Sequence, residues 1–240
     1  MQYSSVSNIG KVRNKNQDYY GSVKVKGNEF FIVADGMGGY KGGEIASKLA
    51  VNFFIDYIKE NQEEESLVNL QEHAINYAND KINEIRKSSD EYYDMGTTVV
   101  CVCIDNKNSL YHFSHIGDSR AYLYSKGVLK QVTRDHSLVN DLLDSGSINE
   151  EEAKNYEHKS TITKVIGCLE DIDVKSLSFE MDKGDIILMT TDGLSNELSK
   201  DEIFAIMTQN NSAEEISKNL VDLAIKKGGH DNITVTTILI

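Results

Sequence analysis

Strand-like and helix-like segments follow one another in blocks along this chain, rather than alternating one by one. The strand-like segments are rich in β-branched and aromatic residues and comprise 19–25, 29–34, 97–104, 109–116, 120–125, 174–179, 185–190 and 232–240. The helix-like segments comprise 44–60, 66–86, 137–154, 200–208 and 212–227. A parallel βαβ repeat needs regular alternation, so this order instead predicts an α+β layered sandwich, in which helices cover two packed sheets.

Local patterns support several of these segments. The pair Gly27-Asn28 is a turn signal that predicts a hairpin between the first two strands. The segment 97–104 is apolar at successive positions, which is typical of a strand covered on both faces. Within 137–154, Ser147 is expected to cap the acidic turn that follows it.

The length and composition are those of one globular domain. The chain has 240 residues, of which 40% are hydrophobic, and it contains no repeat or low-complexity linker. We therefore expect a single domain over residues 1–240. The 25 Lys and Arg residues against 38 Asp and Glu residues give a net charge of −13, which argues against a nucleic-acid partner.

Targeting signals and disulfides are not expected. No apolar run reaches the roughly 20 residues of a membrane span, and the polar start lacks the apolar core of a signal peptide. The three cysteines show neither a disulfide pattern nor a metal-ligand spacing. We expect a cytoplasmic protein without membrane insertion, with reduced thiols.

Aspartates stand next to the ends of several predicted strands. Asp35 in ADGMGG, Asp118 in GDSR and Asp192 in TDGL follow strands, whereas Asp231 in GGHDN precedes one and Asp18 adjoins another. A lone Asp-Gly pair is usually only a turn. Several acids at strand ends can converge, however, and convergent carboxylates repel one another unless a cation lies among them.

Oxygen ligands of this kind select hard cations. Mg²⁺ and Mn²⁺ prefer such ligands, and two of these ions could activate a water and orient a phosphoryl group. The glycines directly beside Asp35, Asp118 and Asp192 would let backbone carbonyls approach the ion. Arg13 could bind phosphate through two hydrogen bonds, although an isolated arginine near a terminus is more often a solvated surface charge.

Other phosphate chemistries fit the sequence poorly. None of Cys101, Cys103 and Cys168 is followed six residues later by arginine, as a cysteine-dependent phosphatase requires. Cys101 and Cys103 share one face of a predicted strand and are expected to be buried core thiols. No GxxxxGK[ST] motif supports a nucleotide-binding loop. His136 and His230 could order loops or lie behind a metal ligand.

Eight short motifs in a fixed order resemble the metal-dependent type 2C Ser/Thr protein phosphatases, in their bacterial branch. They are RNKNQD (13–18), ADGMGG (34–39), GE (43–44), GTT (96–98), GDSR (117–120), RDHS (134–137), TDGL (191–194) and GGHDNIT (228–234). The resemblance covers nearly the whole chain. It implies a four-layer α/β/β/α sandwich with two central antiparallel β-sheets and a substrate-contacting flap at about 137–167.

The resemblance also implies roles for particular residues. It implies that Asp35 bridges two Mn²⁺ or Mg²⁺ ions and that the Gly36 carbonyl completes one coordination shell. It further implies the following assignments: Asp192 and Asp231 as ligands of the first metal, Asp18 as a carboxylate that holds metal-bound waters, Asp118 with Asp192 as ligands of a third and weaker metal, Arg13 as the phosphate-binding residue, and Asn232 as a support for substrate or water.

The mechanism implied is direct hydrolysis of phosphoserine or phosphothreonine in proteins. A metal-bridging water or hydroxide attacks phosphorus, the metals and Arg13 stabilise the equatorial oxygens, and no phosphoenzyme forms. A cognate Ser/Thr kinase and its substrates are the expected partners, and the enzyme is expected to be a monomer. The alternative is a catalytically silent phosphoprotein-binding domain or scaffold. Such domains typically lose metal aspartates, and this chain keeps them all.

The sequence departs from the family pattern at several positions. Met37 and Tyr40 stand where relatives carry histidine, which leaves the proton donor to the leaving oxygen unassigned. Gln17 replaces a common glutamate, and this change could weaken metal affinity. Glu157 and Lys164 lie near positions where the flap usually has proline and arginine.

Overall fold

The computed structural model describes residues 1–38, 42–63, 66–156, 161–168, 170 and 172–240. Its strands form two sheets in which every pair is antiparallel. In the first sheet the order is β1 (Gln2–Asn8), β11 (Ile233–Leu239), β10 (Ile186–Thr190), β7 (Arg120–Ser125) and β8 (Val128–Gln131). In the second sheet the order is β2 (Asp18–Val25), β3 (Asn28–Met37), β5 (Val99–Asp105), β6 (Leu110–Ile116) and β9 (Leu177–Glu180), while β4 (Gly96–Thr97) pairs with β3.

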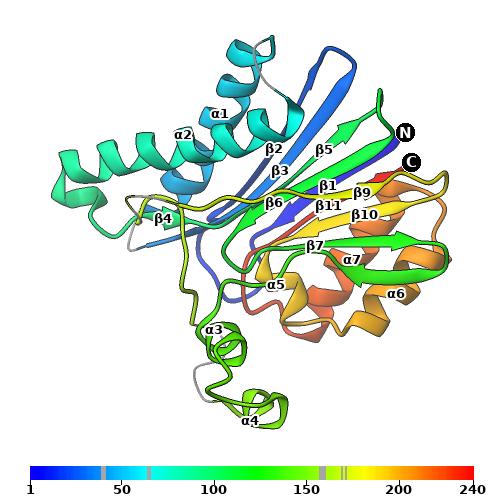
Figure 1. The fold of residues 1–240 in the computed structure, drawn as a ribbon. Helices are drawn as coiled ribbons and strands as arrows, with labels where there is room; N and C mark the ends of the chain where they lie inside the picture. Colours follow the sequence, from blue (N-terminus) through cyan, green and yellow to red (C-terminus); the bar gives the residue numbers. More distant parts are fainter. Residues whose placement is uncertain (39–41, 64–65, 157–160, 169, 171) are drawn as a thin grey trace.

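Helices cover the outer face of each sheet (Figure 1). On the second sheet lie α1 (Gly42–Asn61) and α2 (Leu67–Ser88), followed by a short 3₁₀ turn at Asp90–Tyr92. On the first sheet lie α6 (Lys200–Gln209) and α7 (Ala213–Lys227), and the single turn α5 (Asp192–Ser195) follows β10. The helix pairs and sheets therefore stack as four layers.

Three buried clusters fill the spaces between these layers. The first packs α1 and α2 on the second sheet and includes Phe54 and Cys101. Another packs α6 and α7 on the first sheet and includes Leu188. The last lies between the sheets and includes Phe31 and Ile187. The predicted α/β/β/α sandwich with two antiparallel sheets is confirmed, and the buried Cys101 and Cys103 thiols belong to the core as expected.

Several elements were not predicted from the sequence. β1 carries serines on the side that faces the other sheet, where Ser5 and Ser7 bond to Thr236 and Thr234, so its apolar alternation is weak. β8 has only four residues, α5 is one turn, and β4 is separated from β5 at Thr98. These elements depend on pairing with distant segments rather than on local pattern.

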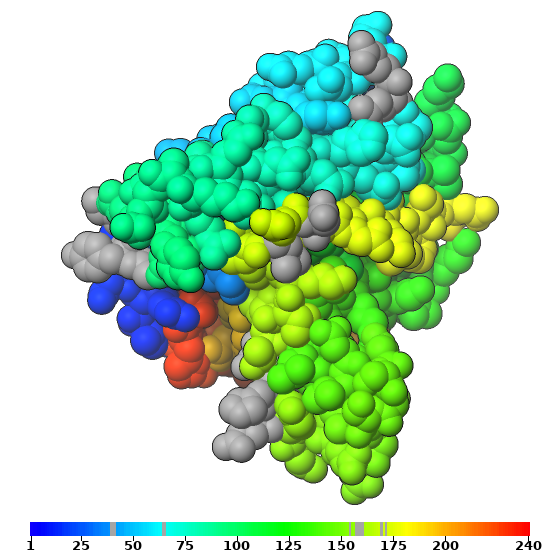
Figure 2. All heavy atoms as spheres, turned by 60° about the vertical axis from the view of Figure 1, so that its left-hand side comes forward, coloured from blue at the N-terminus to red at the C-terminus, as the bar shows by residue number. Residues whose placement is uncertain are grey.

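The helix expected over 137–154 consists of two shorter helices. They are α3 (Leu138–Asp144) and α4 (Glu150–Lys154), separated by a turn. The cap predicted at Ser147 is wrong, because Asn149 caps α4 by accepting hydrogen bonds from the amides of Glu151 and Glu152. The two helices extend away from the sandwich in Figure 1, and their lobe protrudes from the surface in Figure 2.

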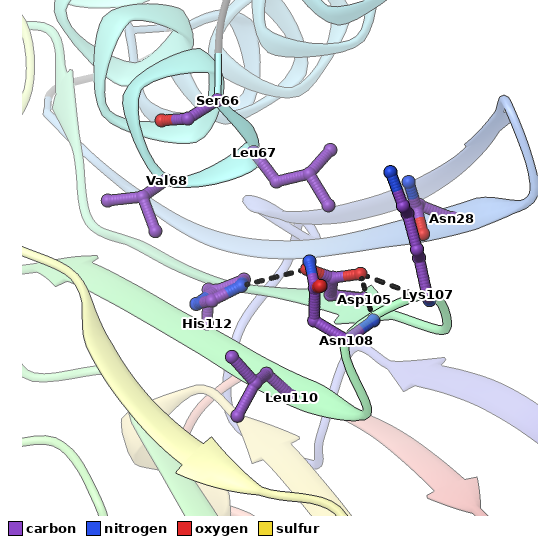
Figure 3. Close-up of a pocket in the computed structure, with 9 residues that line it drawn as sticks. All are labelled: Asn28, Ser66, Leu67, Val68, Asp105, Lys107, Asn108, Leu110 and His112. Atoms are coloured by element: carbon purple, nitrogen blue, oxygen red, sulfur yellow. Dashed lines mark hydrogen bonds and ion pairs between the residues drawn. The ribbon is translucent and has the colours of Figure 1, made fainter.

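One pocket lies at the end of the second sheet that carries the β2–β3 and β5–β6 turns. Asp105 and His112 line it together with residues at the start of α2 (Figure 3). Local structure already engages both side chains, since Asp105 accepts from the amides of Lys107 and Asn108, and His112 Nδ1 bonds to Ser178. This pocket lies at the opposite end of β3 from Asp35.

Among the described residues, no helix combines the length and apolar character that crossing a bilayer requires.

Candidate active site

The five predicted aspartates meet at one end of the sandwich. On the second sheet, Asp18 at the start of β2 lies opposite Asp35 near the end of β3. On the first sheet, Asp192 follows β10 and Asp231 precedes β11. Asp118 lies in the connection from β6 to β7, which passes from one sheet to the other. The strand ends of both sheets therefore supply this acidic edge.

Burial and mutual repulsion raise the pKa values of these acids. Burial raises the pKa of Asp18 to about 7, and it raises the pKa of Asp118 to about 7. The pKa of Asp35 is raised well above its ordinary value, first by burial and then by the negative charges of Asp18 and Asp192. Ionised carboxylates packed this closely require a compensating positive charge.

Three of these aspartates also present an oxygen that no described group satisfies. Among the described residues, the buried Oδ1 atoms of Asp18, Asp118 and Asp192 have no hydrogen-bond partner. Unsatisfied buried carboxylate oxygens are costly unless an ion or water meets them. The donor set is all oxygen, which fits Mg²⁺ or Mn²⁺ and fits soft metals poorly.

The carboxylates are gathered at this edge without forming a complete ligand cluster. Among the described residues, no three Asp, Glu, His or Cys side chains are arranged so that they could hold one metal ion together. Arg13 engages both oxygens of Asp231, with Nε–Oδ1 at 2.8 Å and Nη2–Oδ2 at 2.7 Å. These bonds raise the pKa of Arg13, and the nearby charges of Asp35 and Asp192 raise it further.

Glycines next to the acids allow the loops to pack tightly. A Cβ atom on Gly36 would lie 2.0 Å from the carbonyl oxygen of Gly43. A Cβ atom on Gly193 would lie 1.9 Å from the carbonyl oxygen of Asn232. Any larger residue at either position would separate the loops that carry Asp35, Asp192 and Asp231.

Hydroxyl and amide side chains hold the carboxylates in place. Thr191 Oγ1 donates to Asp18 Oδ2 at 2.9 Å, and Asn196 Nδ2 donates to Asp192 Oδ2 at 3.0 Å. Thr97 Oγ1 donates to the carbonyl of Asp35 at 2.8 Å. Sequence reasoning missed these residues as parts of the site, although Thr97 and Thr191 lie inside the GTT and TDGL motifs.

Asn232 supports the loop that carries Arg13. Its amide nitrogen donates to the carbonyls of Ile9 and Lys15, both at 2.9 Å, and its oxygen accepts from the Gln17 amide at 2.7 Å. The side chain therefore shapes the segment 9–17, and its predicted role as a support for substrate or water stays a prediction. Gln17 in turn accepts from the Gly36 amide and the Ser47 hydroxyl through its carbonyl.

The two histidines left open by the sequence both order loops. His136 Nδ1 accepts from the Gly117 amide at 3.1 Å, and its ring stacks on His115 at 4.7 Å. Burial, then the neighbouring His115 and Lys164, lower the pKa of His136 to about 4. His230 pairs with Glu197 at 2.6 Å on the surface.

Two of the departures from the family pattern lie outside the described residues, namely Tyr40 and Glu157. Met37 ends β3 and is partly buried. Its thioether cannot donate a proton, so Met37 is not the proton donor to the leaving oxygen.

Comparison with known proteins identifies the family. A family model described as protein phosphatase 2C matches residues 11–223. Protein phosphatase PhpP of Streptococcus pneumoniae is 35% identical over 247 residues, covering 99% of this chain and 97% of PhpP. The serine/threonine phosphatase of S. agalactiae is 33% identical with a TM-score of 0.89, covering 100% of this chain and 99% of that one.

A further solved structure bears on the metal. The catalytic domain of the serine threonine protein phosphatase PstP, in complex with two manganese ions, has a TM-score of 0.84 and 29% identity. The match covers 98% of this chain and 96% of that one. With a family model over most of its length and relatives that match it almost end to end, this chain belongs to the bacterial branch of the protein phosphatase 2C family and is a protein serine/threonine phosphatase.

Proposed function

We propose that this protein hydrolyses phosphoserine and phosphothreonine in proteins with the help of two divalent cations, Mn²⁺ or Mg²⁺, at the acidic edge. The observation that carries the proposal is the convergence of five aspartates, three of them with an unsatisfied buried oxygen, next to Arg13. The manganese complex of the PstP catalytic domain supports the choice of metal.

We assign each of the five aspartates a role in metal binding. Asp35 would be common to both ions, and the carbonyl of Gly36 would complete one coordination shell. Asp192 and Asp231 would hold the first ion, and Asp18 would orient water around it. Asp118, with Asp192, would hold a third and weaker ion. The carboxylate oxygens without partners on Asp18, Asp118 and Asp192 support these assignments.

When bound, two such ions supply an activated water and neutralise charge on the phosphoryl group. The residues of the chain perform the rest. Arg13 binds two phosphate oxygens with the same planar fork that now engages Asp231. Thr191 and Asn196 hold the orientation of Asp18 and Asp192.

The hydrolysis is direct, without a phosphoenzyme. A cysteine nucleophile would need a thiolate near the phosphate. Cys101 and Cys103 lie in the core on β5, where burial raises the pKa of both thiols far above the ordinary value. They are therefore unsuited to attack phosphorus.

Phosphoproteins are the proposed substrates, and the kinase that phosphorylates them is the proposed partner. We propose that the enzyme acts as a monomer. Residues 137–167 serve as the flap over the substrate, of which the structure describes α3, α4 and the strand-like return at 161–167.

Turnover of a phosphothreonine peptide tests this function. We expect hydrolysis with Mn²⁺ and none after chelation. Asp35→Asn should lower kcat by more than about 100-fold, because even partners that only orient metal ligands are worth 10–100-fold. The far-ultraviolet circular dichroism should stay unchanged, since the variant removes repulsion from a crowded site.

Asp185→Asn is the matched control. Asp185 is a buried aspartate, 2% exposed, at the opposite end of β10 from Asp192. Its loss should affect stability more than turnover. Metal-independent hydrolysis, or near-normal kcat in Asp35→Asn, would contradict the proposal. Complete inactivity of the wild type would favour the silent phosphoprotein-binding domain.

A further inference from the structure

A cavity of about 520 Å³ lies between the flap and the acidic edge. Its lining comes from three parts of the fold, which are the strand ends, the flap helices and the turn after β10. The lining residues are Asp118, Arg120, Asp135, Ser137, Val139, Asn140, Leu143, Ala153, Asp192, Ser195 and Asn196. Since Asp118 and Asp192 belong both to this lining and to the acidic edge, the cavity opens directly beside the site of phosphate chemistry.

The polar floor of the cavity is an ion pair between Arg120 and Asp135. Arg120 Nη2 lies 2.6 Å from Asp135 Oδ2, and Gln131 Nε2 donates to Asp135 Oδ1 at 3.0 Å. Asn140 Nδ2 donates to the carbonyl of Asp135 at 2.8 Å, which fixes α3 to this floor. The charge of Asp135 is therefore already neutralised within the protein.

The wall of the cavity that belongs to the flap is apolar. Val139 and Leu143 come from α3 and Ala153 comes from α4, and each is only partly buried. Partly exposed aliphatic side chains that face a cavity gain free energy when another apolar group covers them. No cation on this wall faces the cavity among its described lining residues, so the wall is suited to an uncharged group.

We propose that this cavity binds an apolar side chain of the substrate protein, located one to three residues from the phosphorylated residue. This inference rests on the proposed function, because it assumes that the phosphate lies at the acidic edge. An extended chain advances about 3.3 Å per residue, so three residues reach about 10 Å from that edge. A volume of about 520 Å³ is typical of a small-ligand site, and it accommodates a Leu or Phe side chain with adjoining backbone.

Charged side chains fit this position less well. An acidic residue finds no free cation among the described lining residues, because Arg120 is already paired with Asp135. A lysine or arginine finds no free partner in Asp135, because Arg120 occupies both of its oxygens. Asp118 and Asp192 are assigned to the metals.

Phosphothreonine peptides that differ at one flanking position test the proposal. Leu, Gly, Glu or Lys is placed in turn at each position from three before to three after the phosphothreonine. For the wild type with Mn²⁺, we expect kcat/KM about 10-fold higher for Leu than for Gly at one of these positions, as burial of a Leu side chain predicts. Glu and Lys should give no gain.

Two variants and a matched control locate the effect. Leu143→Ala removes the wall, and Ala153→Phe fills the cavity from the other helix, so each should lower the Leu-to-Gly ratio toward 1. Leu142→Ala is the control, because Leu142 is the neighbouring, partly buried residue of α3 that does not line the cavity. It should keep the wild-type ratio.

The outcomes separate the two proposals. Absence of turnover for every peptide overturns the proposed function itself. Turnover with equal kcat/KM for Leu and Gly at all positions, or a preference for Glu or Lys, overturns the apolar subsite alone. A ratio that Leu142→Ala lowers as much as Leu143→Ala and Ala153→Phe overturns its location.

Discussion

Arg13 and Asp231 form an ion pair with two hydrogen bonds although 218 residues separate them in the chain. The same planar fork can bind two oxygens of a phosphate, which is the role proposed for Arg13. The side chain of Arg13 is 52% exposed, which leaves it accessible to a phosphoprotein.

Replacing Arg13 by alanine should therefore raise KM for phosphate substrates by about 10-fold or more, since hydrogen bonds to charged groups contribute about 1.5–3 kcal/mol. Arg13→Lys should lie between the wild type and Arg13→Ala, because lysine keeps the charge and loses the fork. Steady-state kinetics with an aryl phosphate and a phosphopeptide measure both values.

Arg134→Ala is the control for this prediction. Arg134 forms a similar pair with Asp144 at 2.6 Å, and its side chain is 58% exposed. It should leave the KM for the aryl phosphate unchanged. A KM for Arg13→Ala equal to that of the wild type would mean that Arg13 is only a solvated surface charge.

At the scale of helices and strands, a capping residue determines where α6 begins. Ser199 caps α6: its hydroxyl accepts a hydrogen bond from the Glu202 amide, and the Glu202 carboxylate accepts from the amide and hydroxyl of Ser199. The same carboxylate accepts from Lys227 Nζ, at the end of α7, at 2.8 Å. One glutamate thus closes the first turn of α6 and joins it to the end of α7.

These bonds predict a pH dependence of stability. The bonds from Lys227, then those from Ser199, lower the pKa of Glu202 to about 2 from 4.5. A lowered carboxyl pKa stabilises the fold fully above the unfolded value, and this stabilisation disappears as pH falls toward the folded value. The difference in urea midpoint between the wild type and Glu202→Gln should therefore be complete above about pH 4.5 and should shrink toward pH 2.

Asp201→Asn controls for the general effect of removing an acid from this helix turn, because Asp201 takes no part in the described bonds of Ser199 and Lys227. The urea midpoints are measured by circular dichroism between pH 7 and pH 2.5. A difference for Glu202→Gln that stays constant over this range would be inconsistent with the assigned bonds.

The elements that the sequence predicted are those with strong local patterns. The segment that became β5 was predicted because it is continuously apolar, and every residue of β5 is buried. The two amphipathic helices α1 and α2 were predicted because their apolar residues recur with the helical period. β1 was missed because Ser5 and Ser7 bond across to Thr236 and Thr234, and a local window contains neither partner. For the same reason the motifs predicted the acids, whereas the hydrogen bond from Thr191 to Asp18, 173 residues away, required the structure.

At the scale of the whole molecule, metal binding at the acidic edge, as proposed, would be coupled to folding. The proposed ligands come from both sheets and are close together only in the folded state. A cation that they hold would therefore bind the folded state alone. Ligands that bind the folded state alone contribute about 2.7 kcal/mol at 100 times Kd. For a domain of this size, that corresponds to a rise in Tm of about 5–10 °C.

We therefore expect saturating Mn²⁺ to raise Tm by about this amount and a chelator to reverse the change, as measured by thermal unfolding. Asp35→Asn should show a much smaller rise. If Mn²⁺ raised the Tm of Asp35→Asn as much as that of the wild type, the bound ion would lie elsewhere on the protein.

The pairing of β1 with β11 has a consequence for how the protein is made. Gln2 lies opposite Leu239 and Asn8 lies opposite Ile233, so β1 can pair with β11 only after more than 200 further residues have been synthesised. Most of the second sheet and its covering helices come from residues 18–116 and can assemble earlier. Asp231 precedes β11 and reaches the acidic edge only at that final step. A chain that stops before this point can contain Asp18 and Asp35 but lacks Asp231, one of the proposed metal ligands, so we expect it to show no phosphatase activity.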